Sequence, residues 1–418
     1  MSATTATGPL SSTDTSLLQQ QLHRAERRNR LKSLALIAPL VLFLLVIFLL
    51  PMGLMLKKSI ENPDVAALLP DTIAALSHWD GKALPDDAAY HALAEEITRA
   101  SEADKLGNLG KRLNNEIAGY RSLLNNSADG LPFDPAPESW KAAMVELDPR
   151  WGELPYWQAI NRNRSAYTSD YLLSSLDLQH NQAGEIVPVA PEQAIYQDVF
   201  LRTFWMSLVI TACCLLLAYP LAYLLATLPV RTANLLMILV LLPFWTSVLV
   251  RIAAWIVLLQ SNGLINQFLM GLGIIDSPLH LVFNRIGVYI SMVHIMLPFM
   301  VLPLYSVMKS IPNSYQRAAI SLGCSPIASF WRVYFPQTYA GVGAGCLLVF
   351  ILSIGYYITP ALLGSPNDQM VSYFVAFYTN TTINWGMATA LGGLLLLATL
   401  LLYIVYNWLV GADRLKLG

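Results

Sequence analysis

Long apolar stretches are the feature that most constrains the fold of this chain. Each is about 20 residues long, which is enough to cross a bilayer as a helix. The expected spans are Leu34–Met55, Phe204–Leu228, Leu235–Leu258, Gly287–Met308, Ala340–Leu363 and Ala388–Val410. Only 13% of the 418 residues are charged, against about a quarter in soluble domains. The sequence therefore predicts an all-α integral membrane protein with about six transmembrane helices, the first of them at 34–56.

Basic residues predict the orientation of these spans, because short cytoplasmic segments are enriched in Lys and Arg. Five of them precede the first span, namely Arg24, Arg27, Arg28, Arg30 and Lys32. Links expected on that side hold Arg231, Lys309, Arg317, Arg332, Arg414 and Lys416, whereas the outer links hold Asp276, Arg285 and Asp368. We therefore expect cytoplasmic tails at 1–33 and 412–418. A cleaved signal peptide is the alternative for the first span, but its apolar run is longer than a signal's and no small-residue cleavage site follows.

The segment 57–199 has the composition of a soluble domain and is expected to be a periplasmic insertion. A loosely periodic apolar stripe between Asp86 and Asn126 predicts helices. The aromatic residues Trp140, Trp151, Tyr156 and Trp157 lie among prolines and predict a small core. About 140 residues are enough to fold independently. We interpret the insertion as a brace for the membrane part that also contacts a partner, followed by a core with five transmembrane helices at 200–411.

A helix-turn-helix is predicted at 310–337, where a membrane protein would ordinarily have a short polar link. Small residues and a glycine form the run Arg317-Ala318-Ala319 with Gly323, and Ser325-Pro326 begins a second helix. Proline is favoured early in a helix because its missing N–H is not needed there. Small residues let another backbone approach closely. The segment therefore suits docking into a cleft of another polypeptide; an ordinary loop is the alternative.

Several chemistries lack the residues that they need. No Walker-type phosphate-binding loop is present, no Ser-His-Asp or zinc spacing is found, and the net charge of −1 gives no basic footprint for nucleic acid. After Glu192 there is no glutamate, and the aspartates lie outside the expected spans. The sequence thus predicts neither an enzyme nor a metal site. A transport path without its own energy source indicates that another polypeptide supplies the energy; a stand-alone secondary transporter, a channel and a receptor are the alternatives.

Five ordered motifs carry a resemblance to a known family. The run Arg317-Ala318-Ala319-x-x-x-Gly323, with Val333 and Pro336, resembles the EAA loop of permease subunits of binding-protein-dependent ABC importers. Four more stretches resemble the spermidine/putrescine-type branch of this family: Tyr219-Pro220-Leu221-Ala222-Tyr223, Pro243–Ser247 with Arg251, Ser353–Gly364 and Asn384-Trp385-Gly386. Together they cover about 196–410. Two departures are Arg317, where the family usually has Glu, and the large insertion.

The resemblance implies the type I ABC importer permease fold in a bacterial inner membrane, with both termini cytoplasmic. It further implies a coupling helix that contacts a dimer of ATPase subunits, which would hold the ATP and Mg, with no cofactor on this chain. Its contact residues would be Arg317, Ala318, Ala319, Gly323, Ser325 and Pro326. The other implied partners are membrane lipid, a periplasmic solute-binding protein and a second permease subunit. A different chain is favoured for that subunit and a copy of this one remains open.

Candidate pathway residues surround two prolines, Pro243 and Pro360, each of which is expected to interrupt an apolar helix. A broken helix is tolerated where its backbone lines a cavity or a neighbour satisfies it. Beside the prolines lie Phe244, Trp245, Thr246, Ser247, Tyr356, Tyr357 and Thr359. This aromatic and hydroxyl set suits a weakly held amine, and simple helix packing is the alternative. Arg251 either lines the pathway or extends its side chain to water. Polyamines, opines, amino acids and aminobutyrate-like solutes all remain open as substrates.

Overall fold

The computed structural model describes residues 26–27, 30, 32–114, 116–181 and 185–410, so most of the expected tails at 1–33 and 412–418 lies outside the described residues. The first apolar helix, Lys32–Lys57, forms a unit of its own. Its middle is a π-helical stretch, η1 (Leu45–Leu49), which continues into α2 (Leu50–Lys57). Pro51 lies two residues after this stretch, and a proline inside a helix removes a backbone hydrogen bond and displaces the preceding turn. The apolar side chains along this helix are exposed, as in a helix that faces lipid.

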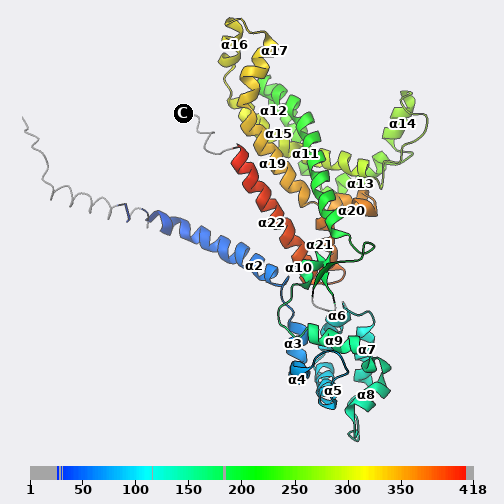
Figure 1. The fold of residues 1–418 in the computed structure, drawn as a ribbon. Coiled ribbons are helices and arrows are strands. Elements are labelled where there is room, and N and C mark those ends of the chain that lie inside the picture. Colours follow the sequence, from blue (N-terminus) through cyan, green and yellow to red (C-terminus); the bar gives the residue numbers. More distant parts are fainter. Residues whose placement is uncertain (1–25, 28–29, 31, 115, 182–184, 411–418) are drawn as a thin grey trace, which may run out of the picture. The chain divides into compact units, whose positions relative to one another are not determined.

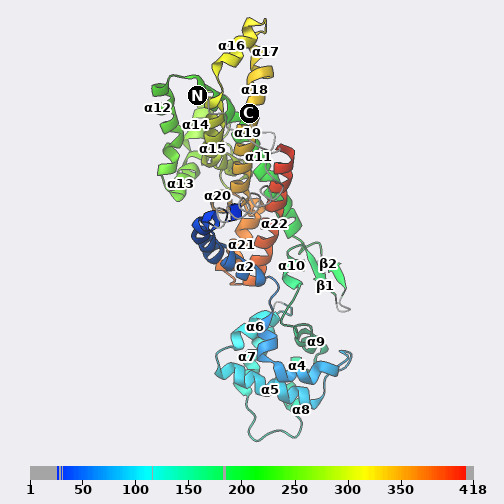
Figure 2. The same cartoon turned by 90° about the vertical axis from the view of Figure 1, so that its left-hand side faces the viewer.

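The insertion is a bundle of short helices with one small hairpin (Figures 1 and 2). Its elements are α3 (Pro63–Leu68), α4 (Pro70–Ala75), η2 (Leu76–His78), α5 (Asp87–Glu102), α6 (Leu106–Asn114), α7 (Tyr120–Gly130), α8 (Trp140–Leu147), η3 (Pro149–Gly152), α9 (Leu154–Arg162), α10 (Asp170–Ser174), β1 (Leu178–His180) and β2 (Ile186–Pro188). The two strands pair antiparallel, with Gln179 opposite Val187. The predicted helical character of 86–126 is confirmed.

An aromatic core holds the insertion together, as the sequence predicted. Trp151 and Trp157 are fully buried with their rings 5.7 Å apart, whereas Trp140 is only partly buried. The Trp151 indole N–H donates to the Ser127 hydroxyl at 2.8 Å, and the Tyr90 hydroxyl donates to the Trp151 carbonyl at 2.8 Å. Buried polar groups of aromatic rings need such partners. The core therefore buries its rings without leaving these groups unpaired.

Direct contacts join the insertion to the last helix of the membrane part. The Lys111 ammonium donates to the Ile383 carbonyl at 2.6 Å, immediately before α22 (Trp385–Val410). The ring of Tyr171 on α10 lies against Gly386, where a side chain would collide with it. Arg112 is buried beneath this contact and pairs with Asp170 at 2.9 Å. The insertion is thus packed on the start of α22 rather than tethered by its ends alone.

The membrane part is built on α11 (Tyr196–Thr227), α15 (Arg285–Ser310) and α19 (Tyr339–Ile354), which pack against one another. Its core is rich in small residues and methionine, including Met292, Met296 and Met300. The remaining elements are α12 (Val230–Leu241), η4 (Leu242–Trp245), α13 (Val248–Leu259), α14 (Leu264–Gly271), α16 (Asn313–Ser321), α17 (Pro326–Ser329), η5 (Phe330–Tyr334), α18 (Phe335–Gln337), α20 (Ile358–Leu363), η6 (Pro366–Asp368), α21 (Val371–Asn380) and α22. Both views place the α16–α17 turn at one end of this bundle and the insertion at the other (Figures 1 and 2).

Among the described residues, five helices are long and apolar enough to cross a membrane, and a sixth span is a pair of helices bent by 58° at Thr338. Four of the predicted spans, Leu34–Met55, Phe204–Leu228, Gly287–Met308 and Ala388–Val410, coincide with long helices. The helix α11 begins at Tyr196, four residues before the expected start of the core at 200. The described residues thus hold five spans, or six when the bent pair is counted as one, which agrees with the prediction of about six.

The predicted span Leu235–Leu258 is wrong as a single helix. The chain there forms α12, the 3₁₀ turn η4 and α13, with extended backbone at Thr246 and Ser247. Pro243 lies in η4, and its missing N–H ends the preceding helix. The stretch there that is long and apolar enough to cross a membrane is instead Val248–Gly271, which comprises α13 and α14.

The predicted span Ala340–Leu363 is also interrupted, but not at Pro360. The helix α19 ends at Ile354 and α20 begins at Ile358, so the break lies at Gly355–Tyr357. Pro360 lies inside α20, within its first turn, where a proline needs no N–H partner. The expectation that Pro360 itself breaks the helix is corrected accordingly.

Candidate functional site

The predicted helix-turn-helix forms as α16 and α17, joined by a turn at Leu322–Cys324. Gly323 has φ +93° there, a left-handed conformation that ends a helix at little cost only for glycine. The Ser325 hydroxyl accepts the Ala328 N–H at 3.3 Å, and Pro326 occupies the first turn of α17. Ser325 and Pro326 thus begin the second helix as the sequence predicted.

The surface of this turn is more apolar than the sequence reasoning anticipated. Ala318 and Gly323 are exposed and Ala319 is half-buried, but the most prominent side chains are Leu322 and Ile327, which are 89% and 74% exposed. Arg317 is exposed as well. The sequence carried a signal for this surface, because two large apolar residues, Leu322 and Ile327, flank a turn that would ordinarily be polar.

Aromatic side chains connect the helix-turn-helix to α11. The Tyr223 ring packs against Phe330 with centroids 5.4 Å apart, and the Tyr219 hydroxyl lies 3.1 Å from the Thr338 hydroxyl at the bend. Tyr334 is buried in the same group. A packed aromatic cluster transmits displacement because a protein interior is close-packed. The cluster thus connects η5 and the bend at Thr338 with α11.

The candidate pathway residues fall into two groups. On η4 and after it, Phe244, Trp245, Thr246 and Ser247 are exposed, with Trp245 at 90%. The Phe244 ring packs edge-on against Phe299 of α15 at 4.9 Å. Tyr357, on the other broken span, is exposed as well.

The second group is a polar cluster where α13, α15 and α20 meet. Arg251 and Tyr356 are half-buried there, and Thr359 is fully buried. Arg251 contributes its Nε, and the Tyr356 and Thr359 hydroxyls are buried too; none of these atoms has a hydrogen-bond partner. The Trp255 indole N–H donates to His294 Nδ1 at 3.2 Å nearby. The contact of His294 with α13 was not anticipated, because His294 lies 39 residues after Trp255 along the chain.

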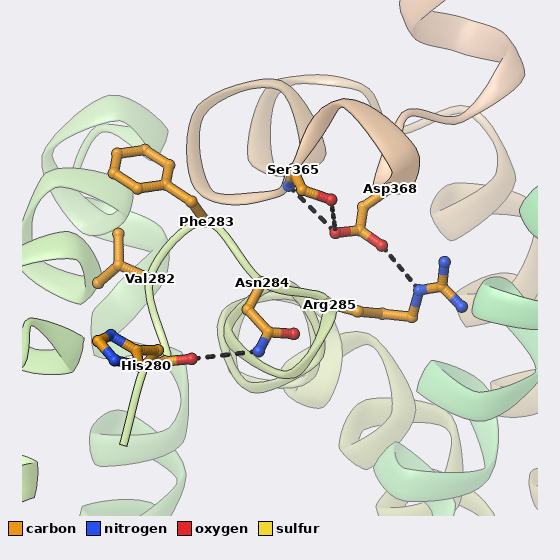
Figure 3. A pocket seen from close by; sticks show the side chains of 7 residues that line it. All are labelled: His280, Val282, Phe283, Asn284, Arg285, Ser365 and Asp368. Carbon is orange, nitrogen blue, oxygen red and sulfur yellow. Dashed lines mark hydrogen bonds and ion pairs between the residues drawn. The ribbon is translucent and has the colours of Figure 1, made fainter. Parts of the chain in front are cut away.

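A cavity of about 460 Å³ lies at the first turn of α15, at the opposite end of that helix from α16. Figure 3 shows Arg285 reaching Asp368, whose carboxylate also faces Ser365. The Arg285 Nε donates to Asp368 at 2.7 Å, and the Ser365 hydroxyl donates at 2.6 Å. Burial raises the pKa of Asp368, but these hydrogen bonds outweigh it, so the pKa lies below its ordinary range. The ion pair joins the start of α15 to the loop after α20.

No group of three His, Cys, Asp or Glu side chains that could hold a metal ion occurs in the part of the chain that the structure describes. The free cysteines are buried or half-buried, at Cys213, Cys214, Cys324 and Cys346. The candidate site is therefore a set of surfaces and polar groups within a helical membrane bundle: the α16–α17 turn with its exposed apolar side chains at one end, an ion pair at the other, and a polar cluster between them.

Residues 216–412 match the family model described as "Binding-protein-dependent transport system inner membrane component". The chain is 35% identical over 212 residues to the spermidine/putrescine transport system permease protein PotB of Escherichia coli (strain K12), covering 51% of this chain and 77% of that protein. It is 35% identical over 214 residues to PotB of Haemophilus influenzae, covering 51% and 75%. A solved bacterial alginate ABC transporter matches with a TM-score of 0.43 and 16% identity, covering 52% of this chain and 79% of that one.

A multi-pass helical bundle, the family model and the two PotB relatives define the class of protein. The chain belongs to the family of inner-membrane permease components of binding-protein-dependent ABC importers. Within that family, the relatives above place it in the polyamine-type branch.

Proposed function

We propose that this chain is the transmembrane permease subunit of an ATP-driven importer. In this proposal it moves a small nitrogenous solute from a periplasmic binding protein into the cytoplasm by alternating access. ATP and Mg are held by a separate ATPase dimer, and a second permease subunit, a different chain, completes the path. The names of the relatives, spermidine/putrescine permeases, support the nitrogenous substrate class.

The observation that carries the proposal is the α16–α17 turn (Leu322–Cys324) at the end of the bundle, which this proposal makes a docking turn. Leu322 and Ile327 project from it as exposed apolar side chains, and a left-handed glycine sets its shape. Exposed apolar side chains that cluster on one feature mark a site of protein contact. With this turn inserted in a groove of the ATPase, closure of the ATPase dimer would push α16 and α17, and the bundle would rock as a rigid body.

The arrangement of the two ends supports the proposed orientation. The insertion and the docking turn lie at opposite ends of the bundle (Figures 1 and 2), as a periplasmic insertion and a cytoplasmic coupling loop require. Cytoplasmic termini follow in this proposal. The insertion packs on α22 through Lys111 and Tyr171, which suits a brace for the bundle, with the binding protein or the second permease as its partner.

The test is the substitution Gly323→Val in the assembled importer. A β-branched residue at φ +93° is strongly disfavoured, so the turn is expected to change shape. Nothing lies within 4 Å of the added Cβ, so the fold elsewhere should tolerate it. We expect ATP-driven uptake to be lost while the chain still inserts in the membrane. Gly271→Val, in α14 and also with open space around its Cβ, is the control. Normal uptake by the Gly323 variant, or a purified chain that transports without any ATPase, would refute the proposal and favour a stand-alone transporter or channel.

A further inference from the structure

The α16–α17 end of the bundle (Figure 1) carries positive charge without an acidic partner. Within 311–337 the charged residues are Arg317 and Arg332, and both are exposed. The acids of the described stretch 196–410 all lie outside this segment, at Asp198, Asp276 and Asp368. Among the described residues, neither arginine forms an ion pair or a side-chain hydrogen bond. Both charges are therefore available to another molecule.

Exposed apolar side chains adjoin Arg317. Ile320 lies three residues after it, on the same face of α16, and is 45% exposed. Leu322 and Ile327, on the two sides of the turn, are large apolar side chains that are almost fully exposed. Protein interfaces typically combine an apolar centre with a polar rim, and apolar side chains beside an unpaired charge have this composition.

The turn presents these side chains on a fixed backbone. The Cys324 N–H donates to the Ala319 carbonyl at 3.0 Å, and the Gly323 N–H donates to the Ile320 carbonyl at 2.9 Å. These are the two hydrogen bonds of a Schellman helix end. The Ser329 hydroxyl also donates to a carbonyl of α16 at 3.3 Å, which joins the two helices. A surface held in this way loses little conformational entropy when it binds.

Building on the proposed function, we propose that the ATPase groove receiving the docking turn is apolar with a carboxylate at its edge, and that this carboxylate pairs with Arg317. A guanidinium binds an Asp or Glu side chain through two parallel hydrogen bonds. A groove with a basic edge would instead meet uncompensated like charge, which disfavours the wrong ATPase. Basic residues also orient membrane spans, but that role requires no particular position on α16. Arg317 thus selects among ATPases by the charge of their grooves.

The first experiment identifies the carboxylate in the complete importer, with its own ATPase and second permease, in nanodiscs of neutral phosphatidylcholine. Arg317→Lys keeps the charge and supplies an amine, which a carbodiimide joins to a carboxyl group only at ion-pair distance. We expect a new cross-link from this variant to an Asp or Glu of the ATPase, mapped by mass spectrometry. The control Arg231→Lys, at an exposed position in the first turn of α12, should give none. An Arg317→Lys variant that cross-links to no ATPase carboxyl group would overturn the inference.

The second experiment measures the affinity of the ATPase for the permease subunits at low and at high ionic strength. Arg317→Gln should weaken binding roughly 10-fold at low ionic strength, as for one lost charged hydrogen bond, and less at high ionic strength. Arg317→Glu should weaken binding further, and replacing the mapped ATPase carboxylate with lysine should restore it. An Arg317→Glu variant that binds like the wild type, or that the lysine does not rescue, contradicts the proposed pairing.

Failure of this inference is distinguishable from failure of the proposed function. Arg317 variants that bind normally, while Gly323→Val still abolishes ATP-driven uptake, would reject the charged groove and leave the importer function standing. A permease that binds no ATPase at all would refute the function itself.

Discussion

The contact between Tyr171 and Gly386 offers a direct test of how firmly the insertion is packed on the membrane part. A Cβ added at Gly386 would lie 2.5 Å from Tyr171 Cζ and 2.6 Å from its Cδ2. Carbon atoms in contact are usually about 3.5–4.0 Å apart, so the ring has to move by about 1 Å. Arg112 lies 5.4 Å from the centre of that ring and restricts its movement. We therefore expect Gly386→Ala to destabilise the packed state by about 1–3 kcal/mol, the usual cost of overpacking.

A matched control lies on the same helix. At Gly392 an added Cβ meets only Val375 Cγ2 at 4.0 Å. Gly392→Ala therefore reduces the backbone freedom of this position without a collision. Alanine is the better helix former by up to about 1 kcal/mol, and this variant should be neutral or slightly more stable. The two substitutions change the same atoms, so a difference between them reports the contact with Tyr171.

The assay is thermal unfolding of the purified complex, together with limited proteolysis of the insertion. Gly386→Ala should melt at a lower temperature and expose 57–199 to protease. Tyr171→Ala removes the ring, so adding Gly386→Ala to it should cost almost nothing further. The reasoning fails when Gly386→Ala melts like Gly392→Ala, or when its penalty persists in the Tyr171→Ala background.

Two further predictions concern the insertion itself. Trp151→Ala should destabilise it by about 3–5 kcal/mol, because a fully buried ring leaves a cavity, while Trp140→Ala at a partly buried position should cost less; equal losses in thermal unfolding would contradict this. Hydrogen bonds from Arg150 hold the pKa of Asp148 below its ordinary value of 3.8. A carboxyl group whose pKa is lower in the folded than in the unfolded state stabilises the fold fully above the unfolded pKa. This stabilisation is lost as the pH falls through the folded pKa. The stability gap between the wild type and Asp148→Asn should thus be largest above about pH 4 and close below it, and a gap independent of pH would refute the assignment.

The local features of this protein were readable from its residues. Apolar length predicted the long helices, because backbone groups in hydrocarbon must pair within their own segment. The turn at Gly323 was also predictable, since glycine followed by Ser325-Pro326 is a local signal for a helix end and a helix start. The aromatic core around Trp151 followed from composition.

Proximity between distant segments was not predictable in the same way. Pro243 indicated a break, but the backbone at Gly355–Tyr357 broke where no proline stands. The sequence also named Arg251, Tyr356 and Thr359 without indicating that they form one polar cluster beside His294.

Short-range rules act through neighbours on the chain. The sequence by itself therefore determined the class of protein, its apolar helices and the turn at Gly323. Which side chains meet depends on how helices far apart in sequence pack, and a single sequence carries no periodic signal for that. Only the tertiary structure decided that Tyr171 rests on Gly386 and that Arg251 lies near Tyr356 and His294.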